Sequence, residues 1–185
     1  MSRVRAPDRA VKITVFADKR SCGDGDFFCP KACIETIDLI VKKGEIMLII
    51  ACVDERNGMM FNYRRQSRDS VVYQDVLREC YGKRLYMNAY SGNLFAESEG
   101  VDIRISEDIL SRAGDEDACF IEDIELAGFE DQIRQVILYK WNRKYPADRY
   151  FTLNLSDGSW ECQKTEEFKG SSHERITKEV YQRIR

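Results

Sequence analysis

The feature that most constrains the fold is an unbroken apolar run, IMLIIACV, from Ile46 to Val53. A strand without polar alternation is buried on both faces, as in the middle of a sheet that helices cover. The run therefore predicts a central strand. Turn residues from Asp54 to Gly58 end it, and a basic segment then leads to Asp69. Because α/β sheets place their sites at the carboxyl ends of such strands, we expect any site to lie in this segment.

Segments with strand and helix patterns alternate along the chain, which predicts the α/β class, with a mixed central sheet flanked by helices. Val11 to Val15 alternates as a strand, and Pro30 begins a helix that Gly44 ends. We therefore divide the chain into an N-terminal strand–loop–helix extension, residues 1–45, and an α/β domain, residues 46–185. Further elements of that domain are predicted as helices over 72–80, 91–95, 107–113 and 176–184, strands over 84–88, 101–105, 118–121 and 133–141, and a hairpin of 150–155 with 160–163.

Composition excludes some classes of protein. The net charge of -3 leaves no global polycation for nucleic acid, and 43% hydrophobic residues are enough for a core. No apolar run is long enough to span a membrane and the first residues lack a signal-peptide core, so a cytoplasmic protein without a membrane partner is expected. Seven cysteines, an odd number, favour reduced thiols. Cys22, Cys29 and Cys33 leave open a redox or metal role, although they form no C-x-x-C pair.

Several phrases resemble the dihydrofolate-reductase-like fold over roughly residues 46–168. Members of that family open with an apolar strand and a phrase much like ACVDERNGMMFN, which here follows Ile50. A helix comes next, and then a strand similar to GKRLYM, which begins at Gly82. The acid-aromatic phrase ADRYF, with Trp160 after it, is similar to one near the end of these proteins. The resemblance implies that Asp69 matches the family's pterin-binding carboxylate.

The same resemblance disfavours a nicotinamide cofactor, and the cofactor stays unknown. The family's reductases carry a Gly-Gly pair that lets the cofactor's pyrophosphate approach, and here Glu122 and Asp123 stand in its place. Their charges would repel a phosphate. The family's cation beyond Met87 is also missing. The chain is therefore expected to share the fold without being a competent reductase.

A weaker resemblance links GMMFNYRRQSRD and FKGSSHERITKE to short bacterial proteins that sometimes carry the label ribonuclease Z. Enzymes of that name hold two zinc ions with a cluster of histidines and aspartates. This chain has one histidine, His173, so the residues do not support that activity, and no metal site is predicted. His173 falls in the capping box from Ser171 to Glu174, which predicts a surface position at a helix start.

Asp54 and Asp69 are the candidate catalytic residues, because paired carboxylates serve as metal ligands or general bases. The alternative makes Asp54 a turn residue and Asp69 a helix cap. Arg64, Arg65 and Arg68 with Asn62 form the candidate ligand site. Crowded guanidinium groups are often held together by a bound anion, so a small anionic ligand or a nucleotide is the expected partner. The alternative is that each arginine pairs separately with Asp54, Glu55 or Asp69.

Two other kinds of function stay open. Aromatic and basic residues interleave from Tyr139 to Tyr150, a mixture that can stack on bases and hold phosphates of nucleic acid. It is also how a strand with packed aromatics and solvated cations ends. The third possibility is a non-catalytic interaction protein with an apolar surface patch. The candidate nucleic-acid residues are Lys140, Trp141, Arg143, Lys144 and Arg149.

Overall fold

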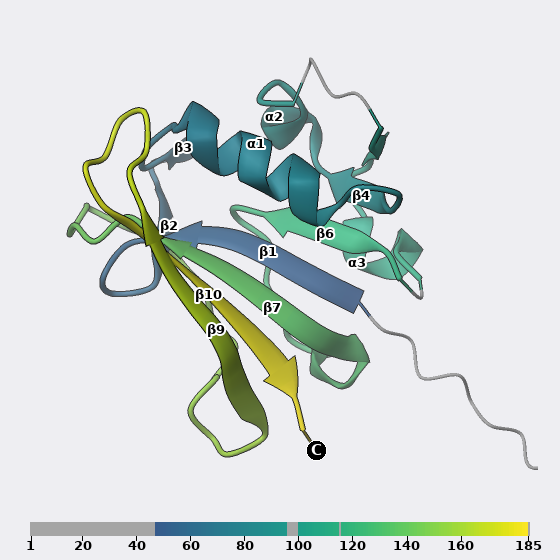
Figure 1. Ribbon diagram of the computed structural model, residues 1–185. Coiled ribbons are helices and arrows are strands. Elements are labelled where there is room, and N and C mark those ends of the chain that lie inside the picture. The colour runs from purple at the N-terminus through teal and green to yellow at the C-terminus, as the bar shows by residue number, and fades with distance from the viewer. Residues whose placement is uncertain (1–46, 96–99, 115, 185) are drawn as a thin grey trace, which may run out of the picture. The chain divides into compact units, whose positions relative to one another are not determined.

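The computed structural model describes residues 47–95, 100–114 and 116–184 (Figure 1). The predicted N-terminal extension, with Cys22, Cys29 and Cys33, lies outside the described residues, and the boundary at residue 45 stays a prediction. The main sheet is built from β1 (Met47–Val53), β4 (Arg84–Met87), β5 (Asp102–Ile105), β6 (Ala118–Ile121), β7 (Ile133–Lys140), β9 (Trp160–Phe168) and β10 (Ile176–Arg183).

The apolar run forms the central strand of this sheet, as predicted. The strand order is β5-β4-β6-β1-β7-β10-β9, and β1 runs parallel to both of its neighbours, β6 and β7. Every residue of β1 is buried, because side chains on both faces of the strand meet apolar layers. Strands β4 and β5 continue the parallel part, whereas β10 is antiparallel to β7 and to β9. The sheet is therefore mixed and the class is α/β, as predicted.

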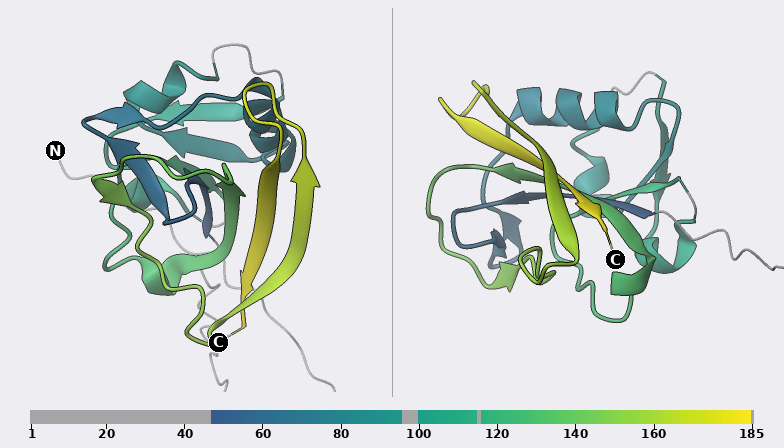
Figure 2. Two further views of the ribbon diagram at one scale, coloured as in Figure 1. Left: turned by 90° about the vertical axis from the view of Figure 1, so that its left-hand side faces the viewer. Right: turned by 60° about the horizontal axis from the view of Figure 1, so that its bottom comes forward.

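Each face of the sheet has its own apolar layer. Helix α1 (Ser70–Glu79) packs Val72, Tyr73 and Val76 on the face that carries Ile50 and Cys52 (Figure 2). The short helix α3 (Ile109–Arg112) and the long loops cover the opposite face, where side chains from Ile49 and Val53 point. Two other short elements lie in the connections, α2 (Ala89–Gly92) and the 3₁₀ turn η1 (Glu130–Gln132). Within the described residues no helix is both long and apolar enough to cross a membrane.

A second, three-stranded sheet follows directly from β1. It has the order β3-β2-β8, with β2 (Gly58–Phe61), β3 (Arg64–Arg65) and β8 (Arg149–Tyr150). Asn62 and Tyr63 form the turn between β2 and β3 with φ of 48° and 58°. Positive φ at both central residues is the geometry that matches the twist of a two-residue hairpin. This sheet delivers the basic segment to the start of α1.

Two predictions about the C-terminal part were wrong. Residues 176–184 form strand β10 and not a helix, because β7 and β9 offer backbone partners on both sides of it. The hairpin of 150–155 with 160–163 does not form: β8 pairs with β2, and the partner of β9 is β10. Asp157 and Gly158 do lie in a bend, with φ of 84° at Gly158, but they precede β9 and do not join two paired strands.

Candidate functional site

Polar groups from four elements meet at the carboxyl edge of the parallel strands. Cys52 lies near the end of β1, Asn88 directly follows β4, and Glu122 directly follows β6. Carboxyl ends of parallel strands share one edge of a sheet, which is where such folds place ligands. Strand β3 then brings Arg65 over this edge, so a cation from the basic segment faces a carboxylate from the centre of the sheet.

Arg65 and Glu122 form a buried ion pair. The Arg65 Nη2 atom lies 3.2 Å from Oε2 of Glu122, and their side chains are 6% and 7% exposed. Ser91 donates its hydroxyl to the same Oε2 atom at 2.6 Å, and Nη2 of Arg65 also donates to the main-chain oxygen of Tyr90 at 3.0 Å. Burying two charges is costly unless geometry and additional hydrogen bonds compensate. Here each charge has such support.

Burial raises the pKa of the Glu122 carboxyl above its usual range, although Arg65 and the Ser91 hydroxyl oppose the shift. Burial alone would lower the pKa of Arg65, but Glu122 and Tyr90 raise it, so the guanidinium group stays charged. Burial also raises the pKa of Cys52 far above that of an ordinary thiol, and Glu122 adds to this shift. Cys52 is therefore a neutral, unreactive thiol at neutral pH.

The remaining donors of Arg65 are not used. Its Nε and Nη1 atoms are buried, and within the described part of the chain neither has a hydrogen-bond partner. The Tyr90 ring covers the guanidinium group at 4.2 Å from its centroid, while the Tyr90 residue is 38% exposed. The Tyr73 hydroxyl is close enough for Arg65 and Tyr73 to perturb each other's pKa. Each of these two buried N–H groups can still donate to a partner that carries a hydrogen-bond acceptor.

The structure separates the three arginines that the sequence grouped. Neighbouring residues on a strand point to opposite faces, so Arg65 is directed inward while Arg64 is exposed. Arg68 is exposed too, but it is close enough to lower the pKa of Glu122. Asn62 lies in the β2–β3 turn, where its main-chain N–H donates to Asp148. The expectation that Arg65 pairs with Asp54, Glu55 or Asp69 was wrong, because its partner is Glu122.

Asp54 has the bonding pattern of a turn residue. Its Oδ1 atom accepts the main-chain N–H groups of Arg56 at 2.7 Å and Gly58 at 2.8 Å. Its Oδ2 atom accepts the N–H of Tyr145 at 3.0 Å, and the side chain is fully buried. The carboxylate therefore fastens the turn after β1 to the segment that follows β7.

Asp69 is the N-cap of helix α1, as its alternative reading predicted. Its Oδ1 atom accepts from the main-chain N–H groups of Val71, Val72 and Ser171 at 3.0, 3.4 and 3.0 Å. Its Oδ2 atom accepts from the N–H and the hydroxyl of Ser172 at 2.7 and 2.9 Å. Burial acts to raise the pKa of Asp69, but these hydrogen bonds, led by the Ser172 and Ser171 N–H groups, hold it well below the ordinary value. The carboxylate ties the β9–β10 loop to the helix start.

The prediction of a surface position for His173 was wrong, because its side chain is 2% exposed. It stacks on Trp141 with ring centroids 4.7 Å apart, and Nε2 lies 2.9 Å from the Tyr145 hydroxyl. Nδ1 lies 2.9 Å from the Ser172 hydroxyl. The sequence around His173 has the pattern of a capping box, but no helix begins there. Ser171 and Ser172 instead donate their main-chain N–H groups to the Asp69 carboxylate.

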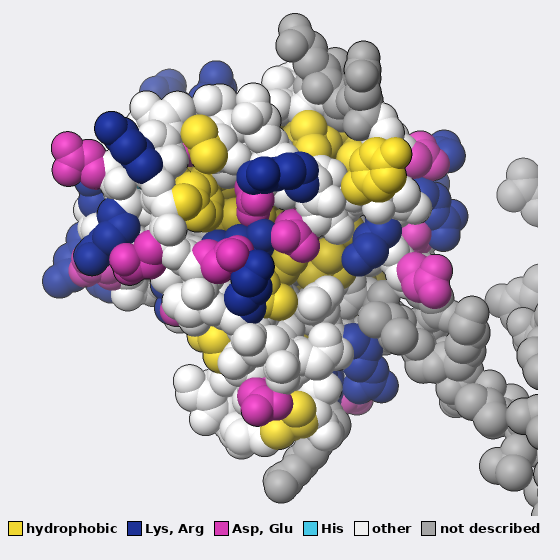
Figure 3. All heavy atoms as spheres, viewed as in Figure 1, with side chains coloured by type: hydrophobic (Ala, Val, Ile, Leu, Met, Phe, Trp, Pro, Cys, Tyr) yellow, Lys and Arg dark blue, Asp and Glu magenta, His cyan; other side chains and the backbone are white. Residues whose placement is uncertain are grey.

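The residues proposed for nucleic acid do not form a stacking platform. Trp141 is 2% exposed and Tyr139 is fully buried, so their rings are part of the core. Lys140 pairs with Glu179 at 2.6 Å, and Lys144 lies 3.8 Å from Glu55. Arg143 and Arg149 are exposed. Figure 3 shows cationic and anionic side chains interspersed over one face of the molecule, not a field of one sign.

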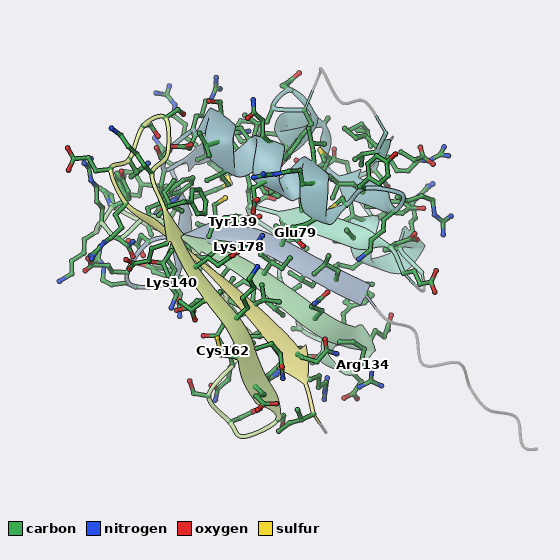
Figure 4. All side chains as sticks on the ribbon, in the orientation of Figure 1. Glu79, Arg134, Tyr139, Lys140, Cys162 and Lys178 are labelled. Atoms are coloured by element: carbon green, nitrogen blue, oxygen red, sulfur yellow. The ribbon has the colours of Figure 1, made fainter. Side chains whose placement is uncertain are left out.

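A second buried charge network lies where helix α1 crosses β7 and β10. The ammonium group of Lys178, 3% exposed, binds Asp75 at 2.6 Å and Glu79 at 2.5 Å. The Tyr139 hydroxyl donates to Asp75 at 2.7 Å, and Figure 4 shows Tyr139, Lys178 and Glu79 together. All these groups satisfy one another, which is the pattern of a structural anchor between helix and sheet.

The described cysteines are free thiols: Cys52, Cys80 and Cys119 are buried and Cys162 is exposed. In the described ranges, no group of three or more His, Cys, Asp or Glu side chains is arranged to hold a metal ion.

Comparison with known proteins identifies the fold. No family model and no curated protein matches the chain. A solved structure that matches is the dihydrofolate reductase from Enterococcus faecalis complexed with NADP(H) and RAB-propyl, with a TM-score of 0.55 and 13% identity. The match covers 76% of this chain and 97% of that chain. The chain therefore has a dihydrofolate-reductase-like fold, as its sequence predicted, and at this identity the likeness shows the fold alone. The resemblance to proteins labelled ribonuclease Z is not supported.

Sequence reasoning found Arg65 but missed its surroundings. The sequence resemblance presents Glu122 only as an obstacle to a phosphate, whereas an acid directly after a buried strand is also a signal for a buried charge. Tyr73, Tyr90 and Ser91 come from two helices, and nothing in the sequence indicates that they meet the Arg65–Glu122 pair.

Proposed function

We propose that this protein binds a small anion, a carboxylate or a phosphate group, at Arg65, and that it is not a nicotinamide-dependent reductase. The observation that supports the proposal most directly is the pair of buried, unused donors, Nε and Nη1 of Arg65. A buried donor without a partner costs about 1–3 kcal/mol, and guanidinium N–H groups are strong donors to carboxylate and phosphate oxygens. An anion that binds there removes this cost.

An anion can reach these donors only if the Tyr90 side chain moves. Tyr90 covers the guanidinium group, and it belongs to the four-residue helix α2 at the surface. Rotation of an exposed aromatic side chain is a fast and small rearrangement. Arg68, exposed and close to the same pair, adds positive charge at the entrance. The site therefore suits a small anion that carries an apolar or aromatic group against Tyr90.

The hydrogen-bond donors at the start of helix α2 are already used, which argues against the binding of a dinucleotide. The fold family's pyrophosphate would approach the segment after β6, and here Glu122 and Asp123 fill it. Asn88 donates to Asp123 at 3.1 Å, and the Ala89 N–H donates to Glu107 at 3.3 Å. The chain's own carboxylates thus take the donors that a phosphate would need, and their charges repel it.

A second candidate function, non-catalytic interaction, is favoured by aromatic side chains on the smaller sheet. Tyr63 is 83% exposed, Phe61 49% and Tyr150 46%. Exposed tyrosines and phenylalanines beside arginines have the composition of interface hot spots. Tyr63 also holds a left-handed backbone conformation at its turn, which is uncommon for an aromatic residue.

The test is a thermal-shift and calorimetric screen with sulfate, inorganic phosphate, acetate, AMP and NADPH. We expect sulfate or phosphate to raise the melting temperature of the wild type in a concentration-dependent way. The double variant Arg65→Met/Glu122→Gln removes both charges of the buried pair and should lose this protection, while the exposed-site control Arg64→Met should keep it. If no anion protects the wild type, the anion site does not exist. Tight NADPH binding with hydride transfer to a pterin would overturn the exclusion of reductase activity.

A further inference from the structure

Anion binding at Arg65 has a consequence for the carboxylate beside it. Resting on the proposed anion site, we propose that each bound anion is accompanied by one proton, which Glu122 takes up from solvent. The site would then hold an anion and a proton together, and its affinity would depend on pH even for an anion that does not itself titrate.

The geometry places the two acceptors on one guanidinium group. Glu122 already uses Nη2 of Arg65, at 3.2 Å, and the unused donors are Nε and Nη1 of the same group. An anion on either Nε or Nη1 is adjacent to Nη2 and therefore lies within a few ångströms of the Glu122 carboxylate. Two like charges that share one cation disfavour each other's ionisation. A strong-acid anion such as sulfate cannot take the proton, so Glu122 must.

The other groups that face Glu122 do not supply a second buried cation. Cys52 from β1 and Tyr73 from α1 are neutral at neutral pH, because burial raises the pKa of each. Asp123, next along the chain, raises the pKa of Glu122, whereas Arg68 lowers it from an exposed position. Tyr90 from α2 faces Arg65, which lowers the Tyr90 pKa against burial, and Tyr90 brings no positive charge.

Ser91 can hydrogen-bond to Glu122 in either protonation state of that carboxyl. Its hydroxyl donates to Oε2 of Glu122 at 2.6 Å in the ion pair. A hydroxyl rotates and has two acceptor lone pairs, so it can equally accept the proton of a neutral Glu122. Protonation therefore keeps the hydrogen bond between Ser91 and Glu122. Burial has already raised the pKa of Glu122, so part of the cost of protonation is met before the anion arrives.

Isothermal titration calorimetry with sulfate tests the coupling. The titrations are done at one neutral pH in Bis-Tris and in Tris, because the ionisation enthalpies of these two buffers differ. The difference in measured heat gives the number of protons taken up, and the charged form of each buffer is a cation that does not compete with sulfate. We expect close to one proton per sulfate for the wild type, and an affinity that rises up to about tenfold per unit fall in pH. Glu122→Gln removes the acidic group but keeps its shape. This variant should bind sulfate at least as tightly at neutral pH, without proton uptake and without pH dependence.

Glu125→Gln is the matched control, since Glu125 is an exposed carboxylate on the same loop, and its proton uptake should equal that of the wild type. Sulfate binding to the wild type without proton uptake would overturn the coupling while leaving the anion site intact. Weaker binding by Glu122→Gln would also overturn it, because Glu122 would then be a ligand. Failure of every variant to bind sulfate at any pH would overturn both proposals.

Discussion

Asp69 offers the sharpest test of how the site region is held together. Asp69→Ala removes the acceptor for four main-chain N–H groups and for the Ser172 hydroxyl at once. Loss of an N-cap costs about 0.5–2 kcal/mol, and a hydrogen bond to a charged group contributes about 1.5–3 kcal/mol. With two such bonds lost to Ser171 and Ser172, partly compensated by water, we expect the free energy of unfolding to fall by about 3–5 kcal/mol.

Urea unfolding followed by tryptophan fluorescence measures this change, because Trp141 and Trp160 are both buried and become exposed on unfolding. Asp69→Asn keeps one amide oxygen for the helix cap but places an NH₂ group against the Ser172 N–H, so it should lose about half as much. Gln74→Ala, on the exposed surface of the same helix, should change the stability by less than about 0.5 kcal/mol. A loss below about 1 kcal/mol for Asp69→Ala would refute the reasoning.

The same carboxylate has a signature in acid. Its pKa is lower in the folded protein than in the unfolded chain, where an aspartate titrates near about 3.9. Below that pH the unfolded chain binds the proton more readily, so stability is lost as the pH falls further. The wild type should therefore show a steeper loss of stability below about pH 4 than Asp69→Asn. Equal slopes for the two proteins would mean that Asp69 is not ionised and hydrogen-bonded as described.

Two more changes test the other buried groups. Lys178→Met should lower the free energy of unfolding by about 3 kcal/mol, because Asp75 and Glu79 lose the ammonium group between them; a neutral result in urea unfolding would contradict the anchor role. Burial and then Arg143 lower the pKa of His173, so the unfolded chain takes up the proton first, and stability should fall as the pH drops below about 6.5. His173→Gln should remove that dependence, and its persistence in the variant would show that another group titrates.

The fold was predictable where one signal dominated. The run from Met47 to Val53 has no polar residue, so it fits only a strand that is buried on both faces. The helix predicted over residues 176–184 was wrong because their apolar spacing fits a helix as well as a strand. The sequence also gives no sign that Lys178 is buried. Two carboxylates from α1 make that burial possible, and a sequence shows no such pairing in advance. Long-range partners thus override local pattern at β10.

The sequence predicts where the candidate site segment lies, but it does not predict the contacts of its side chains. A central strand followed by a basic segment predicted that the segment lies at the carboxyl edge of the sheet, and Arg65 does reach that edge. Which arginine turns inward depends on the pairing of β2 with β3, in which Met60 faces Arg65 and Phe61 faces Arg64. A shift of one residue in that register would exchange the buried and the exposed arginine. Such a register is a property of the folded hairpin.

The fold is shared at 13% identity to the reductase, and in this chain the carboxyl edge of the parallel strands carries a buried ion pair. The sheet requires only apolar residues with the correct period, which many sequences supply. The edge is different, because each buried charge there needs its own partner. Placing Glu122 after β6 requires a cation within reach, and Arg65 on β3 provides it. The cation in turn carries more donors than one carboxylate can fill. The two of these donors that have no partner among the described residues, Nε and Nη1, are the basis of the anion site proposed at Arg65.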